Sequence, residues 1–308
     1  MRFTLKQLQA FVAAAQDSNV SSAAKALSLS QSAVSAAIAE LEGQFGRPLF
    51  DRIGKRLQLN ETGKQLLPKA INLLTQAQEL EQYARSGEAT GNFRVGATLT
   101  IGNYLAAQLI SDYMSAYPAS RIQLKVANTS QIIEGMRRFE IDVGLIEGEC
   151  YDPDIQALPW CDDEMVVFCA PGHALAQRGE IGLADLSQQP WILREPGSGT
   201  RALFDRAVTG RLTHLNVQLE LEHTEAIKRA VESGLGIGCL SRLSLREAFR
   251  RGSLVEIPTP QFDLRRNFYI VRHRQRHESA AMRSFTALCR EIGQQASDTG
   301  ALVLPFIP

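Results

Sequence analysis

Two short helices joined by a tight turn are predicted near the N-terminus, and this pattern constrains the fold more than any other. In the second helix, Val34, Ile38 and Leu41 follow one another at i, i+4 and i+7, which places them on one buried face. The hydroxyl groups of Ser21 and Ser30 are expected to cap the first and the second helix, respectively. The pattern therefore predicts a helix-turn-helix with one apolar face and one exposed face.

The exposed face of the second predicted helix carries short polar and methyl side chains that suit the major groove of DNA. Glutamine can hydrogen-bond adenine, serine can bond bases or phosphates, and alanine can contact the methyl group of thymine. The alternative is an ordinary helix hairpin with no nucleic-acid partner. The residues predicted to contact DNA, from both helices and from the basic segment after them, are Ser22, Gln31, Ser32, Ser35, Ala36, Arg52, Lys55 and Arg56.

A small β-wing with a basic tip is predicted directly after the helices. Residues 43–64 contain five Lys and Arg against two Asp and Glu, which is a local net charge of +3. Such a cluster beside a helix-turn-helix suits phosphate contacts, which orient a protein on DNA without reading its sequence. Alternatively, Arg52 or Arg56 pairs with Asp51 or Glu61 on a solvated surface.

Residues 3–63 resemble the winged helix-turn-helix of LysR-type transcriptional regulators. One difference is Asn60, where members of the family often carry threonine, and both residue types can cap a helix. The resemblance continues more loosely to about residue 295. The matching segments are Leu8–Phe11, Ser22–Ala24, Leu27, Ser30–Ser35, Ile38, Leu41–Glu42, Leu49–Arg52 and Leu59–Gly63.

The resemblance implies an α/β protein with an N-terminal winged helix-turn-helix, a long linker helix and a two-lobed effector-binding domain. It implies that the chain crosses between the two lobes near 160–164 and 262–267, as in periplasmic binding proteins. The expected partners are promoter DNA, a small effector and RNA polymerase. The expected divisions are a DNA-binding domain at 1–60, a linker helix and hinge at 61–90, an effector domain at 91–296, with lobe I at about 91–162 and 266–296 and lobe II at about 163–265, and a tail at 297–308.

The predicted linker helix carries a leucine repeat. Leu66, Leu73 and Leu80 recur at seven-residue intervals with alanines between them, which is a coiled-coil pattern, and Pro68 is expected to bend the helix. The seam could pack on the chain's own core. However, two recognition helices must be held at a fixed separation to read an interrupted palindrome. The repeat therefore favours a homodimer, which the resemblance extends to a homotetramer, with a hinge over 86–92.

From Phe93 onward, the pattern changes to strands that alternate with helices. The first three strands, within 93–146, predict a parallel α/β sheet, and a second set of strands and helices follows. The Gly-rich run at 234–238 lacks the spacing of a dinucleotide fingerprint and is expected to turn a helix tightly into a strand. The predicted strands are 93–97, 122–126, 142–146, 165–169, 217–221 and 268–271, and the predicted helices are 103–117, 130–139, 199–209, 224–233 and 279–293.

Four loops that follow predicted strands are rich in hydroxyl groups or glycine. In open α/β sheets, ligands bind at the carboxyl ends of the strands, against helix N-termini. Backbone N–H groups, hydroxyls and arginines there bind oxyanions or carboxylates well. The alternative is that these residues only cap helices, and His223 is expected to be structural or capping. The predicted effector-binding residues are Thr98, Thr100, Asn128, Thr129, Ser130, Arg194, Ser198, Thr200, Arg201 and Thr224.

The effector is therefore expected to be a small anionic metabolite, an oxyanion or a carboxylate. The Thr98/Thr100 pair and the segment 194–201 look similar to branches of the LysR-type family that sense sulfur oxyanions or regulate carbon fixation. Glu147 and Glu149 could instead meet an amine, although a solvated loop is the expected setting for both.

No enzyme is indicated, because Ser198 lacks the strand-flanked GxSxG elbow of a nucleophile and no P-loop is present. Two alternatives are a solute-binding protein or transferase on the same bilobal fold, and an architectural DNA-binding protein. The first is disfavoured by the fused helix-turn-helix and the missing export signal. The second is disfavoured by a net charge of +0.

The five cysteines are odd in number and scattered, with no metal-ligand spacing. Reduced and mostly buried thiols are expected, and a peroxide sensor built on Cys150 and Cys161 is the alternative. No cofactor or metal is expected. The sequence has no apolar run of membrane-spanning length and no signal-peptide core, which predicts a cytoplasmic protein without membrane contact.

Overall fold

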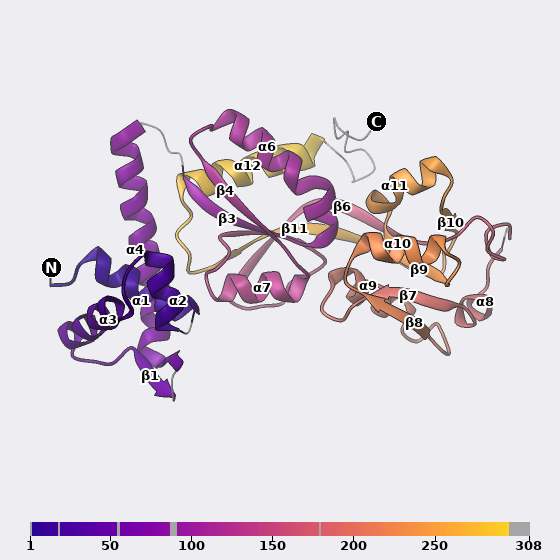
Figure 1. The fold of residues 1–308 in the computed structure, drawn as a ribbon. Helices are drawn as coiled ribbons and strands as arrows, with labels where there is room; N and C mark the ends of the chain where they lie inside the picture. Colours follow the sequence, from indigo (N-terminus) through magenta and orange to yellow (C-terminus); the bar gives the residue numbers. More distant parts are fainter. Residues whose placement is uncertain (1, 18, 54–55, 87–90, 179, 296–308) are drawn as a thin grey trace.

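The computed structural model describes residues 2–17, 19–53, 56–86, 91–178 and 180–295. The chain begins with a compact unit that we call the head (Figure 1). The predicted apolar stripe is confirmed, because Val34, Ile38 and Leu41 are buried and pack with Phe11 and Leu49 in one apolar cluster. The head consists of α1 (Leu5–Asp17), α2 (Val20–Leu27), α3 (Gln31–Phe45), β1 (Phe50–Ile53) and β2 (Arg56–Leu59).

The caps of the two predicted helices differ from each other. Ser30 caps α3 as expected, since its hydroxyl accepts a hydrogen bond from the Ala33 N–H at 3.1 Å. The expectation that Ser21 caps α2 is wrong. Asn19 is extended and its side chain accepts from the Ser21 N–H at 2.8 Å, so the helix begins two residues earlier than expected and Ser21 lies inside it.

Helix α4 (Glu61–Ser86) follows the wing and stands beside the head (Figure 1). Asn60 caps it as predicted, accepting from the Gly63 N–H at 2.9 Å. Its first turns pack on the apolar cluster of the head through Leu67 and Ile71. Further along, Leu80 is 71% exposed and Tyr83 64% exposed. The leucine seam is therefore divided, with one half packed on the chain's own core and the other half facing solvent.

A single mixed sheet with helices on both faces forms the rest of the described chain. Its strands run in the order β4-β3-β5-β11-β6-β9-β7-β8, and β10 pairs with β6. The strands are β3 (Asn92–Ala97), β4 (Arg121–Val126), β5 (Val143–Glu147), β6 (Ile155–Cys169), β7 (Pro190–Arg194), β8 (Asn216–Leu221), β9 (Ile237–Ser241), β10 (Val255–Ile257) and β11 (Arg265–His273).

The predicted parallel pairing of the first three strands is confirmed for β3, β4 and β5, but the sheet as a whole is mixed. Strands β4, β3 and β5 are parallel to one another, and so are β8, β7 and β9, but β6 and β11 run antiparallel between these two sets. The two long strands pair with each other from Arg265 opposite Glu164 to His273 opposite Ile155. They are antiparallel because the chain passes from one lobe to the other along β6 and returns along β11.

Helices cover both faces of each lobe. In lobe I, α6 and α12 lie on one face of the sheet and α7 lies on the other (Figure 1). The predicted helix at 103–117 begins earlier, at Leu99, and includes a π-helical turn. The helices of lobe I are α5 (Leu99–Ile101), η1 (Gly102–Ala106), α6 (Ala107–Ala116), α7 (Thr129–Arg137) and α12 (Ala280–Gln295), and those of lobe II are α8 (Leu183–Ser187), α9 (Gly199–Val208), α10 (Thr224–Glu232) and α11 (Arg242–Arg251).

Each lobe has its own apolar core. Phe93, Tyr113 and Phe285 are buried together in lobe I, whereas Trp191 and Phe204 centre a separate cluster in lobe II. Within the described ranges, no helix is long and apolar enough to cross a membrane.

Candidate functional site

The exposed face of α3 contains the residues that were predicted to contact DNA. Gln31, Ser32, Ser35 and Ala36 are all exposed, and Ser22 is exposed on the neighbouring helix α2. The same helix buries its apolar stripe in the head. The small side chains of α3 are therefore free to meet an external surface.

The wing is tied directly to α3. The carboxylate of Glu42 accepts hydrogen bonds from the backbone N–H groups of Leu49 and Phe50, at 2.7 and 3.3 Å. The strands pair antiparallel as predicted, from Phe50 opposite Leu59 to Ile53 opposite Arg56. Lys55 and the side chains of Arg52 and Arg56 lie outside the part of the chain that the structure describes.

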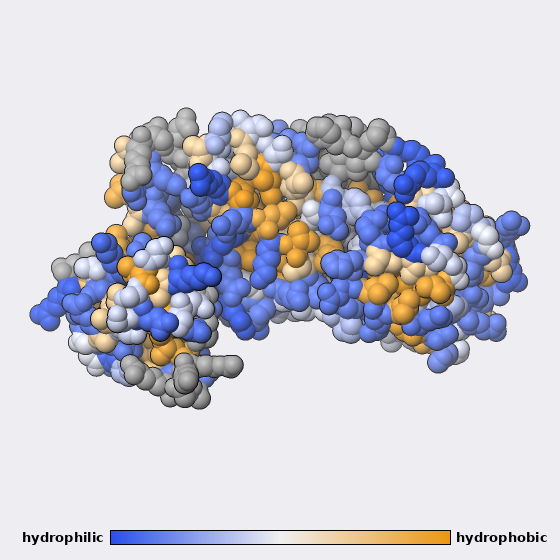
Figure 2. All heavy atoms as spheres, in the orientation of Figure 1, coloured by the Kyte–Doolittle hydropathy of each residue, from blue (hydrophilic) through white to orange (hydrophobic). Residues whose placement is uncertain are grey.

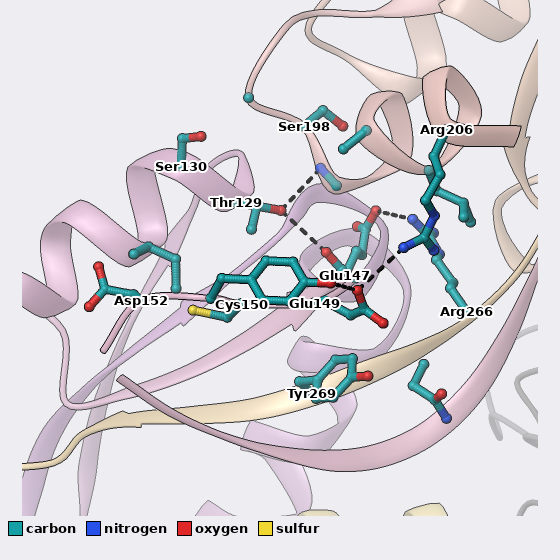
Figure 3. Close-up of a pocket in the computed structure, with 18 of the residues that line it drawn as sticks. Thr129, Ser130, Glu147, Glu149, Cys150, Asp152, Ser198, Arg206, Arg266 and Tyr269 are labelled. Carbon is teal, nitrogen blue, oxygen red and sulfur yellow. Dashed lines mark hydrogen bonds and ion pairs between the residues drawn. The ribbon is translucent and has the colours of Figure 1, made fainter. Parts of the chain in front are cut away.

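A cavity of about 770 Å³ lies between the two lobes, and we call it the cleft cavity. Its wall comes from α7, the end of β5 and the loop after it, the start of α9 and the crossover strand β11 (Figure 3). The hydroxyl groups of Thr129, Ser130 and Ser198 line it together with the guanidinium groups of Arg206 and Arg266. The cleft cavity therefore offers several hydrogen-bond donors in a partly enclosed space.

Three of the hydrogen bonds that cross the cleft beside this cavity involve the N-terminus of α7 and the residue before it. The Ser130 N–H donates to the Gly197 carbonyl at 3.1 Å, and the Gly199 N–H donates to the Thr129 hydroxyl at 3.1 Å. The Asn128 side chain also donates to the Glu195 carboxylate at 3.1 Å. These contacts join the N-terminus of α7 in lobe I to the loop before α9 in lobe II.

Position 199 requires glycine, because a Cβ there would collide with the backbone oxygen of Glu147.

A buried carboxylate stands at the floor of the cleft cavity (Figure 3). Glu147 at the end of β5 is 1% exposed. Its oxygens accept hydrogen bonds from the Thr100 N–H at 2.8 Å and from the Thr200 hydroxyl at 2.7 Å, and Arg266 pairs with it at 3.1 Å. Burial alone would raise the pKa of Glu147, but the positive charge of Arg266 and the hydrogen bond from Thr200 outweigh burial and hold the pKa at about 2. The carboxylate is therefore ionised.

Arg266 connects this carboxylate to lobe II. Its Nε lies 2.7 Å from the carboxylate of Asp163, which in turn accepts from the Ser241 hydroxyl at 2.7 Å. The side chain of Arg266 is 2% exposed, and its Nη2 has no hydrogen-bond partner among the described residues. A buried donor without a partner is costly, so this guanidinium stands out among the residues that line the cavity.

The structure brings only some of the predicted effector-binding residues to the cavity wall. Thr129, Ser130 and Ser198 line the cavity, and Thr100 and Thr200 lie behind it on Glu147. Thr98 and Thr224 are buried, and their hydroxyls have no partner in the described ranges. The three others are held by nearby groups: Asn128 caps α7, Arg194 pairs with Glu195, and Arg201 pairs with Asp205 and Glu220.

Sequence reasoning missed the charged centre of the cleft. Glu147 was expected on a solvated loop, and this expectation is wrong because donors from both lobes enclose its carboxylate. The arginines 206, 265 and 266 were not singled out. Two consecutive arginines, separated by Asn267 from the apolar run Phe268–Val271, were the available signal, since a strand between apolar layers rarely holds an unpaired charge.

The thiols do not suit redox chemistry. All five cysteines are free, and four of them are buried. Burial raises the pKa of Cys161 to about 12 and that of Cys169 to about 11, and it also raises the pKa of Cys150, Cys239 and Cys289. Reactive cysteines require a depressed pKa. Burial and a raised pKa therefore favour reduced thiols at Cys150 and Cys161 over a peroxide sensor.

Comparison with protein families places both parts of the chain. Residues 5–64 match the model described as bacterial regulatory helix-turn-helix protein, lysR family, and residues 86–294 match the LysR substrate binding domain. The chain is a LysR-type transcriptional regulator. This is a DNA-binding, non-enzymatic family whose second domain binds an effector.

Individual relatives and solved structures agree with this assignment. The uncharacterized HTH-type transcriptional regulator YeiE of Escherichia coli (strain K12) is 44% identical over 94% of this chain and 98% of its own length. The structure of a full-length OxyR point variant from Pseudomonas aeruginosa shares the fold, with a TM-score of 0.72, 24% identity and coverage of 94% of both chains. The CcmR regulatory domain from Synechocystis, solved in complex with 2-PG, has a TM-score of 0.62 and 27% identity, and covers 67% of this chain and 98% of that one.

Proposed function

We propose that this LysR-type regulator responds to a small anionic metabolite, an oxyanion or a carboxylate, that binds in the cleft cavity. The observation that supports an anion most directly is Arg266, a buried guanidinium with one nitrogen that has no partner within the described chain. Hydroxyl groups of Thr129, Ser130 and Ser198 stand around the same cavity and can donate to the remaining oxygens of the ligand. The CcmR domain in complex with 2-PG is consistent with a small ligand.

The surroundings of Glu147 also support an anionic ligand, because they already hold one carboxylate of the protein. The Thr100 N–H, the Thr200 hydroxyl and Arg266 together hold a carboxylate by charge-assisted hydrogen bonds. The cleft thus already contains the donors that recognise an oxyanion. An anion that binds there acts as an effector only if it binds one arrangement of the lobes better than the other.

We further propose that the head binds promoter DNA through the exposed residues of α3, Ser22 of α2 and the basic wing, and that the chain acts as a dimer or tetramer with RNA polymerase as partner. The exposed apolar half of α4, at Leu73, Leu80 and Tyr83, supports a dimer seam. Figure 2 shows a further apolar area on the exposed face of lobe I, where Met114, Leu124 and Val126 are exposed on α6 and β4.

Isothermal titration calorimetry of the full chain against sulfite, sulfate, phosphate and small carboxylates tests the anion. We expect saturable binding of at least one of them, and the variant Arg206→Ala should weaken it by about tenfold through loss of a charged donor. Arg178→Ala is the matched control, because Arg178 is about as exposed as Arg206 (53% against 62%) but pairs with Asp185 away from the cavity. If no anion binds, or if both variants lose affinity equally, the proposal is wrong.

A further inference from the structure

Phe139, directly after the C-terminal end of α7, has an unusual backbone conformation. Its φ is +57°, in the left-handed region that a bulky residue rarely adopts. Its side chain is 4% exposed and belongs to the apolar cluster of the head, together with Phe11, Leu67 and Ile71. A residue of lobe I thus adopts a strained conformation and buries its ring in the DNA-binding head. Strain of this kind persists only where the surroundings enforce it, and it concentrates at functional positions.

The backbone oxygen of Phe139 joins the same two parts of the molecule. It accepts a hydrogen bond from the side chain of Gln16 on α1 at 3.0 Å and another from Arg94 on β3 at 2.6 Å. Arg94 and Arg276 both pair with the buried carboxylate of Asp142. A charged cluster in lobe I therefore fixes the position of an oxygen that binds the head.

A second set of contacts lies along α4. The Asn72 side chain donates to the Gln275 carbonyl at 2.7 Å and accepts from the His277 N–H at 2.7 Å. Further along α4, the Glu79 carboxylate accepts from the Ala280 N–H at 2.8 Å. These polar contacts position α4 beside lobe I, and the ring of Phe139 adds the buried apolar contact.

Two elements connect Phe139 with the cleft cavity. Helix α7 begins at Thr129 and Ser130 on the cavity wall and ends just before Phe139, and it lies on the lower face of lobe I in Figure 1. Strand β11 contributes Arg266 to the cavity, and the ring of His273 at its other end lies 4.2 Å from the ring of Phe139. Helix α7 and strand β11 therefore form two continuous connections between the cleft cavity and Phe139.

We propose that Phe139 is the anchor by which the effector domain holds its own DNA-binding head, and that α7 and β11 couple the state of the cleft to this anchor. The proposed anchor is inferred from the contacts of Phe139 alone. The proposed coupling also requires the proposed function, namely that an effector binds in the cleft cavity. The head then has a docked and a released state, and a change in the cleft contacts of α7 shifts the balance between them.

Hydrogen–deuterium exchange on the full chain tests the anchor. The variant Phe139→Gly removes the ring but suits a positive φ, so lobe I keeps its backbone while the head loses its contact. We expect the α1 amides around Gln16 to exchange about tenfold faster or more, with Phe139→Leu in between. Ser28→Gly is the matched control, because Ser28 also has a positive φ, of 54°, but lies in the turn after α2. Unchanged exchange around Gln16 in Phe139→Gly would overturn the anchor.

The coupling is tested by a second substitution at the cleft. Thr129→Val removes the hydrogen bond that Thr129 accepts from Gly199, and we expect it to change exchange around Gln16 only while Phe139 is present. Equal effects of Thr129→Val with and without Phe139→Gly overturn the coupling but leave the anchor intact. None of these measurements needs a ligand, so a failure of every anion to bind in calorimetry is a separate result.

Discussion

The head and the effector domain assemble their functional surfaces in different ways. In the head, one helix provides both the buried stripe of Val34, Ile38 and Leu41 and the exposed face around Ser35. In the effector domain, Thr129, Glu147, Ser198 and Arg266 meet at one cavity although they belong to four different elements. A surface built on one helix therefore follows from local periodicity, whereas a cavity between lobes follows from long-range pairing.

The two regions also differ in how they use charge. The exposed residues of α3 that were predicted to contact DNA, Gln31, Ser32, Ser35 and Ala36, are all uncharged, so the proposed recognition depends on shape and hydrogen bonds. The cleft centres on an ionised, buried carboxylate that is enclosed by a guanidinium, one hydroxyl group and one backbone N–H. A single added charge should therefore have its largest effect in the head, and a single removed charge should matter most in the cleft.

The largest effect is expected for a negative charge on the exposed face of α3. Ser35→Glu places a carboxylate against the phosphates and should reduce specific DNA binding about a thousandfold or more, toward the non-specific level. Genomic fragments selected by the wild-type protein provide the probe, and gel-shift titration measures the change. Ser115→Glu, which adds the same charge at an exposed position of α6, should bind normally. Undiminished binding by Ser35→Glu would mean that another face of the head meets DNA.

An intermediate effect is expected when the buried carboxylate of the cleft loses its charge. Because the pKa of Glu147 is lowered to about 2, the carboxylate stabilises the folded state above its ordinary pKa of 4.5, and this stabilisation is lost as the pH falls from 4.5 toward 2. Glu147→Gln should therefore lower the free energy of unfolding at pH 7 by roughly 2–3 kcal/mol and flatten its dependence on pH in this window.

Urea unfolding at a series of pH values measures this change. Glu61→Gln is the control, since Glu61 forms an exposed pair with Lys64 and should alter stability by less than about 0.5 kcal/mol. If the free energy of unfolding of Glu147→Gln changes with pH in parallel with that of the wild type, the charge of Glu147 does not stabilise the folded state.

The smallest effect is expected at the basic wing. Arg52→Ala should weaken binding to all DNA sequences alike, because a phosphate contact positions the protein without reading bases. The slope of log affinity against log salt should fall by about 1. A loss of affinity for only one DNA sequence would instead indicate that Arg52 contacts a base. The wing would then contribute to sequence recognition, as α3 is proposed to do.

The parts of the fold that sequence reasoning predicted share a local origin. The apolar stripe of α3, the cap at Ser30, the wing and the cap at Asn60 each depend on residues within a few positions of one another. Most of the predicted strands and helices of the effector domain were also found, because alternation and periodicity are local signals. The misplaced cap of α2 was a local ambiguity between Ser21 and Asn19.

The cleft could be predicted only in outline. Its hydroxyl-rich loops were found, and three of the ten predicted effector-binding residues, Thr129, Ser130 and Ser198, lie on the cavity wall. The pairing of Glu147 with Arg266 was not found, because these residues are far apart in sequence and meet only where the two lobes face each other. The same holds for Phe139, whose ring reaches the head only after lobe I and α4 have come together.

The kinds of element, the exposed face of α3 and the family to which the chain belongs followed from the sequence, since hydrophobic periodicity and motif spacing are properties of neighbouring residues. Three features emerged only in the folded molecule: β6 and β11 run antiparallel between two lobes, a charged pair lies at the floor of the cleft, and a residue of lobe I packs in the head. These features depend on which segments, distant in sequence, are buried against one another, and a local sequence pattern does not contain that information.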